Sequence, residues 1–98
     1  MTGPREGAKA PRLRVGPVLV DDEDGRAVAA AIADANEGVE VLHRDGYLRV
    51  SAPAPCVVAR ADVEEQLGRP FSLRGDLEKA MTSFQGRLQL DDEVARWL

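Results

Sequence analysis

Three side chains are candidates for catalysis: His43, Cys56 and Ser83. His43 is the single histidine, so no second imidazole exists to form a metal pair, and no histidine lies near Cys56 in the sequence. Cys56 follows a proline, and a buried structural thiol is the expected role there. Ser83 lacks the strained strand-to-helix elbow of a serine nucleophile. The sequence therefore predicts no catalytic residue and favours binding or regulation.

Four consecutive acidic residues, Asp21-Asp22-Glu23-Asp24, allow two interpretations. One is a calcium site, but the run lacks the spacing of an EF-hand loop, and contiguous carboxylates do not point the same way. The other is a helix N-terminus, where a carboxylate accepts hydrogen bonds from free N–H groups and the helix dipole favours negative charge. We expect the helix start, capped by Asp21 or Asp22, and no metal site.

The composition is that of one small globular domain: 98 residues, 44% hydrophobic and 31% charged. The net charge of −4 is uneven, because residues 1–14 sum to +3 and the rest therefore carries −7. An acidic body argues against nucleic acid, whose phosphates require a basic surface. No apolar run approaches the roughly 20 residues of a membrane helix. The absence of an apolar leader and the single cysteine predict a cytoplasmic protein.

The chain divides into a tail and a domain. Residues 1–14 are rich in glycine, proline and charge without periodicity, which predicts a flexible basic tail, with one domain over residues 15–98. Asp45-Gly46 is the strongest turn signal and predicts a hairpin. The elements expected in the first part of the domain are a strand at 15–20, a helix ending near Ala35, hairpin strands at 39–43 and 47–52, a strand at 56–59 and a helix at 62–67.

The stretch from Leu67 to Leu88 connects the second predicted helix to the last strands of the domain. Gly68 is placed to end a helix in left-handed geometry, Pro70 prevents an immediate restart, and Ser72 is placed to cap a short third helix. Residues 81–86 then predict a polar loop with two hydroxyls and an aromatic ring. Strands follow at 87–90 and 94–98, with Trp97 as a candidate anchor. The fold class is α+β, with antiparallel sheets, three short helices and the rough order β-α-β-β-β-α-α-β-β.

Five motifs in this chain follow the order of a known family. They are Val15-Gly16-Pro17-Val18-Leu19, Ala35-Asn36 with Gly38 and Val41, Tyr47-Leu48-Arg49-Val50 with Ala52, Glu64-Glu65-Gln66-Leu67-Gly68-Arg69-Pro70-Phe71, and Ser83-Phe84-Gln85-Gly86-Arg87-Leu88. With this ordered set the chain resembles the regulatory (effector, or coupling) proteins of bacterial multicomponent monooxygenases, which include those of methane monooxygenase and phenol hydroxylase. It is most similar to the toluene and alkene type.

The resemblance implies a function. Such proteins carry no cofactor and dock on the large subunit of a diiron hydroxylase, which works with a reductase and in some systems a Rieske ferredoxin. Docking tunes access of substrate and oxygen and couples NADH oxidation to hydrocarbon hydroxylation or epoxidation. The residues that the resemblance places at the hydroxylase interface are Asn36, Met81, Thr82, Ser83, Phe84 and Gln85. Those that it implies as structural supports are Gly16, Pro17, Gly68, Pro70, Phe71 and Gly86.

Two positions depart from the family's pattern: Ala80, where relatives often carry asparagine, and Gly75, which adds a residue to the third helical segment. Two other functions remain open on the residues alone. A stand-alone small-molecule-binding α+β domain would need a pocket with convergent polar groups. An enzyme acting through Cys56 or His43 would need activity from the isolated chain.

Overall fold

The structure, a computed structural model, describes residues 13–98. The predicted tail therefore lies almost wholly outside the described residues. Its last residue, Arg14, instead begins the first strand. There its guanidinium donates hydrogen bonds to the carbonyl oxygens of Gly38 (2.9 Å) and Ser51 (3.0 Å).

The described residues form an α+β fold, as the sequence predicts. They contain antiparallel strands, three α-helices and one π-helical turn, η1. In chain order the elements are β1 (Arg14–Val20), α1 (Glu23–Ala35), β2 (Glu40–Arg44), β3 (Tyr47–Pro53), β4 (Cys56–Ala59), α2 (Arg60–Leu67), η1 (Leu73–Leu77), α3 (Glu78–Ala80), β5 (Met81–Gln85), β6 (Leu88–Leu90) and β7 (Val94–Trp97).

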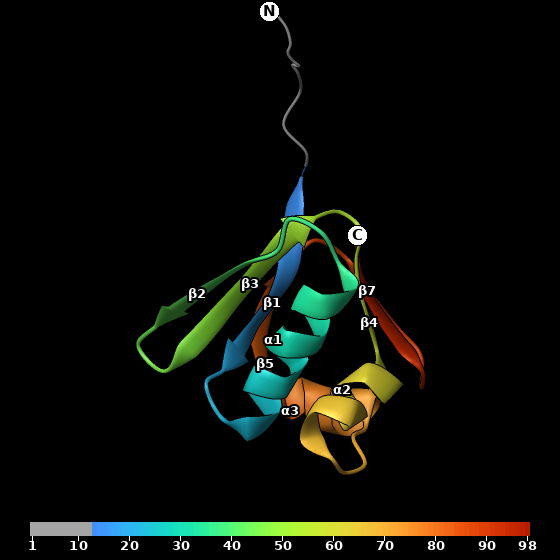
Figure 1. The fold of residues 1–98 in the computed structure, drawn as a ribbon. Helices are drawn as coiled ribbons and strands as arrows, with labels where there is room; N and C mark the ends of the chain where they lie inside the picture. Colours follow the sequence, from blue (N-terminus) through green and yellow to red (C-terminus); the bar gives the residue numbers. More distant parts are fainter. Residues whose placement is uncertain (1–12) are drawn as a thin grey trace, which may run out of the picture.

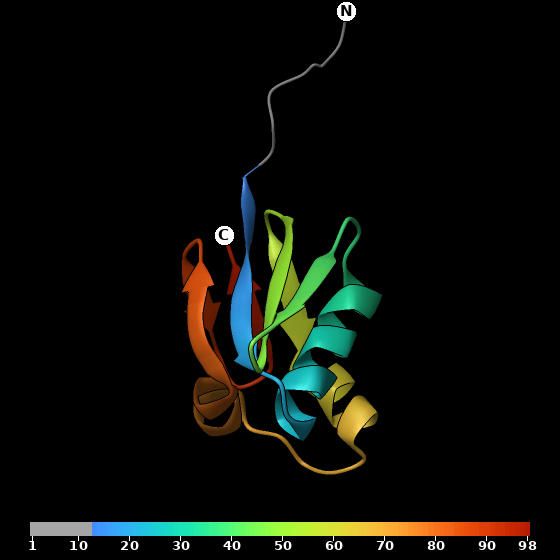
Figure 2. The same cartoon turned by 90° about the vertical axis from the view of Figure 1, so that its left-hand side faces the viewer.

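The strands make two antiparallel sheets, a larger one in the order β2-β3-β1-β5 and a smaller one in the order β4-β7-β6. In Figure 2 the blue β1 runs between the green β3 and the orange β5. α1 packs against β1, β3, β4 and α2, and the short helices α2 and α3 gather at one end of the sheets (Figure 1). β2 and β5 are therefore the two edges of the larger sheet.

α1 begins and ends as its sequence predicts. The carboxylate of Asp22 accepts a hydrogen bond from the Gly25 N–H at 2.8 Å and so caps one of the helix's free donors. Val28 and Ile32, four residues apart, share one face and are fully buried. At the other end the backbone N–H of Asn36 bonds to the Ile32 carbonyl. The acidic capping residue thus correctly predicted the start of α1, and the four-residue spacing of Val28 and Ile32 correctly predicted its buried face.

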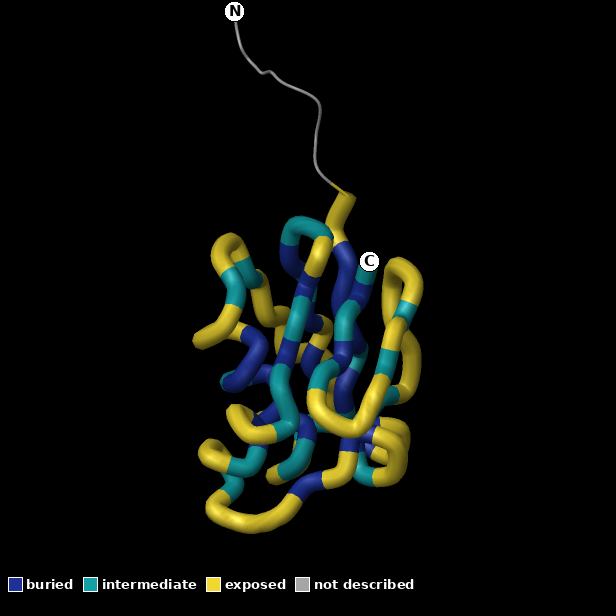
Figure 3. The backbone as a smooth tube through the Cα atoms, turned by 90° about the vertical axis from the view of Figure 1, so that its right-hand side faces the viewer, coloured by how far each residue is buried: buried dark blue, intermediate teal, exposed yellow. Residues whose placement is uncertain are grey.

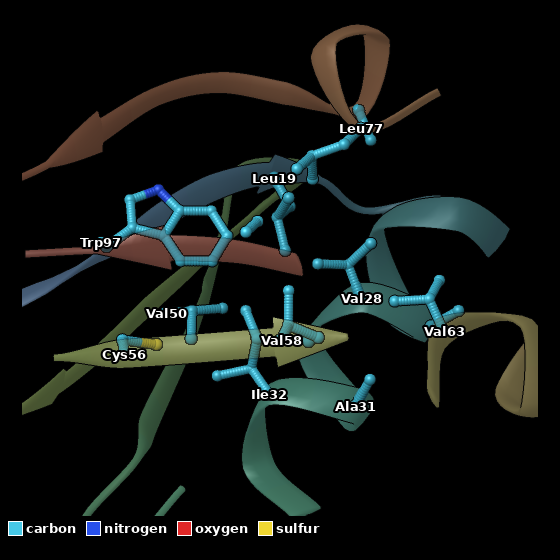
Figure 4. Close-up of a cluster of buried hydrophobic side chains, with 14 of the residues drawn as sticks. Leu19, Val28, Ala31, Ile32, Val50, Cys56, Val58, Val63, Leu77 and Trp97 are labelled. Atoms are coloured by element: carbon cyan, nitrogen blue, oxygen red, sulfur yellow. The ribbon is translucent and has the colours of Figure 1, made fainter. Parts of the chain in front are cut away.

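One hydrophobic core lies between the two sheets and the helices. Figure 4 shows Trp97 of β7 beside Leu19 of β1, and Val58 of β4 beside Ile32 of α1, and all four are fully buried. Full burial of each of the three aliphatic side chains contributes about 1.5–3 kcal/mol to the stability of the fold. In Figure 3 the buried segments run through the middle of the molecule, and exposed segments form its outer turns. The prediction that Trp97 anchors the end of the chain is confirmed.

Residues 81–86 differ most from expectation, because a strand lies where the sequence predicts a loop. β5 covers Met81–Gln85 and pairs antiparallel with β1. The prediction failed because most of β5 is exposed, so it lacks the apolar alternation that marks a half-buried strand. Pairing with a strand more than sixty residues away in the chain determines its conformation instead.

The third helical segment is also unusual. Its first turn, Leu73–Leu77, is π-helical and continues into α3. A π-turn closes its hydrogen bonds from i to i+5 and so holds one more residue than an α-turn. This geometry accommodates one additional residue around Gly75, the position that departs from the pattern of the resembled family. The helix before it, α2, begins at Arg60, two residues earlier than predicted.

Candidate functional site

β5 brings five of the six predicted interface residues into one short edge strand, Met81 to Gln85. In its register with β1, Gln85 lies opposite Gly16, Phe84 opposite Pro17, and Ser83 opposite Val18. The register then shifts between Val18 and Leu19, which forms a bulge. There the Thr82 hydroxyl donates a hydrogen bond to the Val18 carbonyl at 3.3 Å. A bulge next to an edge reorients side chains and often marks a functional position.

The residues of β5 after Met81 are exposed, and the strand contains no charged residue. Phe84, one of two phenylalanines in the chain, keeps 43% of its surface accessible to solvent. Proteins usually protect an exposed edge strand with lysine, proline or charge, because its free N–H and C=O groups can pair with another chain. An uncharged edge with an exposed ring is instead typical of a surface that another protein covers.

Two glycines, both predicted as structural, allow β1 and the end of β5 to lie close to their neighbours. Gly86 ends the strand at φ +98°, and a Cβ there would lie 2.7 Å from both the Leu98 carbonyl oxygen and a Val15 methyl. Gly16 has φ +141°, and its Cβ would lie 2.4 Å from the Val50 carbonyl oxygen. Any side chain at either position would clash with backbone or core atoms. Pro17, opposite Phe84, is fully buried.

The segment before β5 is held by a carboxylate. Gly68 ends α2 in left-handed geometry (φ +73°), and Pro70 follows at the surface. The Phe71 N–H then donates to the Glu64 carboxylate at 2.9 Å, and this hydrogen bond, with help from the Arg60 guanidinium, lowers the pKa of Glu64. The Phe71 ring is buried, with 3% exposed.

The last helical turns connect this anchor to β5. The Ser72 hydroxyl accepts a hydrogen bond from the Gly75 N–H at 3.0 Å, as its predicted capping role requires. Leu77 is fully buried and Ala80 nearly so, whereas Met81 is only half-buried. Because the chain emerges from the core at Ala80, the position of β5 is fixed at its start.

The sixth predicted interface residue, Asn36, lies on a different part of the fold. Its side-chain amide donates to the carbonyl oxygens of Ile32 (2.9 Å) and Val57 (2.8 Å) and accepts from the Val57 N–H (3.1 Å). These bonds join the end of α1 to β4, in the smaller sheet. The structure thus gives Asn36 a structural role at this position and does not bring it together with β5.

The side chains that could carry chemistry are not assembled. Burial raises the pKa of the Cys56 thiol to about 11, which leaves it protonated and unreactive. His43 lies exposed on β2. Within the described part of the chain, no three of the histidine, cysteine and acidic residues are grouped to hold a metal ion. Across residues 13–98, no helix is both long and apolar enough to span a membrane.

Sequence reasoning did not single out the outer face of the larger sheet. Leu42 of β2 and Tyr47 of β3 lie there with 50% and 45% of their surfaces exposed. The alternation in β3, where Leu48 and Val50 are buried, was the available signal, because it turns Tyr47 and Arg49 to the opposite face. A hairpin alone does not show that β1 and β5 extend this face into a continuous surface.

Comparison with known proteins gives one consistent result. Residues 13–98 match the MmoB/DmpM family. An alkene monooxygenase system effector subunit from Xanthobacter autotrophicus (strain ATCC BAA-1158 / Py2) is 38% identical over 85 residues, which cover 85% of this chain and 83% of that protein. Two chains from structures of the phenol hydroxylase–regulatory protein complex are each 27% identical and cover 87% of this chain. They have TM-scores of 0.78 and 0.72, with 97% and 100% of their own lengths covered.

Proposed function

The chain belongs to the MmoB/DmpM family, and from this premise we propose that it is a cofactor-free regulatory component that binds the diiron hydroxylase of a multicomponent monooxygenase. It is not itself the catalyst. It acts in the cytoplasm beside a reductase and, in systems that contain one, a Rieske ferredoxin. On binding, it tunes the access of substrate and oxygen and couples NADH oxidation to hydrocarbon oxidation.

The relatives support the regulatory role. One similarity is to an effector subunit of an alkene monooxygenase system, and it spans most of both chains. The structural similarity is to chains from complexes of phenol hydroxylase with its regulatory protein, and it spans nearly all of those chains. From these relatives we infer that the binding partner of this chain is the hydroxylase of a monooxygenase system.

The observation that supports a hydroxylase interface at β5 is that this edge strand is exposed and contains no charged residue. It presents Phe84 on a support formed by β1 and by the buried end of α3. Exposed aromatic residues on such supports commonly dominate the energy of a protein interface. We therefore assign the contact with the hydroxylase to Thr82, Ser83, Phe84 and Gln85.

A regulatory protein without a cofactor can act only through differential binding. If it bound two hydroxylase conformations equally well, it would shift neither. Moving a hydroxylase from 1:99 to 99:1 between two conformations requires a preference of roughly 5.5 kcal/mol. An edge strand paired with β1 suits this task, because its hydrogen-bonded backbone presents the side chains in a defined order to the opposing surface.

A binding experiment tests the assignment of β5. Ser83→Arg adds a long charged side chain to the exposed strand, and Gln89→Arg adds the same group at an exposed position of β6 in the other sheet. Calorimetric titration into the hydroxylase should show a clear loss of affinity for Ser83→Arg and little change for Gln89→Arg. Equal affinities for both variants and the parent chain would remove β5 from the interface.

A further inference from the structure

The outer face of the larger sheet contains a groove of about 580 Å³. All of its lining residues lie on strands of the larger sheet or in the β2–β3 turn. The residues that decide its chemistry are Val18, Leu42, Arg44, Asp45, Tyr47 and Arg49.

The strand register extends the groove across the whole sheet. Leu42 lies opposite Arg49, and Arg49 lies opposite Val18. Val18 in turn lies opposite Ser83 of β5. Thr82 of β5, which bonds to the Val18 carbonyl, also lines the groove. The groove therefore ends at the strand to which we assign the hydroxylase contact, and the two form one continuous surface.

Apolar surface and unpaired positive charge meet in the groove. Leu42 and Tyr47 are among the few large apolar side chains that remain exposed. Neither Arg44 nor Arg49 forms an ion pair with any residue of 13–98, and Asp45 is the one acidic residue in the lining. In a chain of net charge −4 this is a local reversal of sign. It fits an apolar segment that carries carboxylates.

The same observations disfavour other occupants. A small ligand would not be enclosed, because all lining residues lie on one sheet and its β2–β3 turn, and a drug-sized ligand normally has 70–90% of its surface buried. A two-fold contact between copies would set arginine against arginine, since both partners would use the same patch. Residues 1–12 of this chain carry Arg5, Lys9 and Arg12 against Glu6, so they share the sign of the groove.

We propose that the groove is a second part of the hydroxylase interface and that it receives an acidic, partly apolar segment of the hydroxylase. Leu42 and Tyr47 contact its apolar side chains, and Arg44 and Arg49 bind its carboxylates. This inference rests on the proposed function, and it specifies the chemistry of the partner surface that lies beside β5. Positive charge at such a position also steers the encounter, so it raises the association rate.

The test compares two double variants of the full chain with equal changes in charge. Arg44→Gln/Arg49→Gln removes the groove charges. Arg26→Gln/Arg74→Gln removes two exposed arginines that pair with acidic residues elsewhere on the surface. Affinity for the hydroxylase is measured at low and at moderate salt. We expect the groove variant to bind roughly tenfold or more weakly, with a slower association rate and a smaller salt dependence. The control should stay within about twofold of the parent chain.

Each outcome has a distinct meaning. If the parent chain and the groove variant bind equally well at both salt concentrations, the groove proposal is wrong while the proposed function stands. If the parent chain does not bind the hydroxylase at all, the proposed function itself fails. If light scattering shows that the parent chain forms a dimer that the groove variant does not, a second copy is the occupant and the proposal is overturned. Thermal unfolding of both variants checks that each is folded.

Discussion

Replacing Phe84 with alanine separates a docking role from a folding role, and the chain provides a matched control. The two phenylalanines differ sharply in exposure, with 43% for Phe84 and 3% for Phe71. The same substitution at the two sites removes the same atoms from an exposed strand edge and from the core. The two variants should therefore lose different properties.

The magnitudes follow from the exposed surface. A phenylalanine presents roughly 200 Å², so with 43% of Phe84 exposed about 90 Å² is available to a partner. At about 25 cal/mol per Å² this surface contributes about 2 kcal/mol, or roughly 30-fold in Kd. The remaining, covered surface of Phe84 is about 110 Å², so its loss should cost at most about 2–3 kcal/mol of stability, because the unfolded chain already buries part of this area. Phe71→Ala should cost about 3–5 kcal/mol, because it opens a cavity in the core.

Two assays separate these effects. Urea unfolding should show a modest shift for Phe84→Ala and a large one for Phe71→Ala. Titration into the hydroxylase should show roughly 30-fold weaker binding for Phe84→Ala, with less product formed per NADH consumed. If Phe84→Ala instead unfolds as readily as Phe71→Ala and keeps full affinity and coupling, the ring is a core residue, and assigning Phe84 to the interface is wrong.

Three further predictions concern the support of the interface and the inert chemistry of the chain. Gly86→Ala should destabilise the fold by about 2 kcal/mol or more in urea titration, because its Cβ would lie 2.7 Å from the Leu98 carbonyl oxygen. Gly46→Ala, where a Cβ meets nothing within 4 Å, should show only the smaller cost of positive φ. Because the folded chain holds the pKa of Glu64 below its ordinary value of 4.5, the stabilisation is complete above that pH and is lost as the pH falls through the lower folded value. Glu64→Gln should therefore reduce the acid dependence of urea stability, and an unchanged dependence would contradict the hydrogen bond. Cys56, with its pKa raised to about 11, should resist a thiol reagent until the chain unfolds, and rapid labelling of the native protein would show that it is not buried.

Local signals in the sequence predicted those parts of the fold that local contacts determine. Asp22 caps α1, Asp45 and Gly46 turn the hairpin at positive φ, and Gly68 ends α2. Each depends on a single turn of backbone, so residue type is informative. The α+β class followed from counting these elements.

The parts that sequence reasoning missed depend on long-range pairing. β5 has no buried face to give it a period of two, so nothing local distinguishes it from a loop. The groove exists because register places Leu42, Arg49 and Val18 in one row across three strands. Asn36 is predicted at the interface by its place in a motif, and no local signal showed that its amide bonds to Val57, which lies in the smaller sheet. In each case the missing information was a partner distant in sequence.

The central claim is that this chain regulates a hydroxylase and performs no catalysis of its own. The most direct measurement is product formed and NADH consumed by the hydroxylase and reductase as the chain is added in increasing amounts. We predict that product per NADH rises and saturates near equimolar chain and hydroxylase, while the chain without hydroxylase forms no product. A flat response across the titration with the cognate hydroxylase, or product formed by the chain alone, would contradict the account.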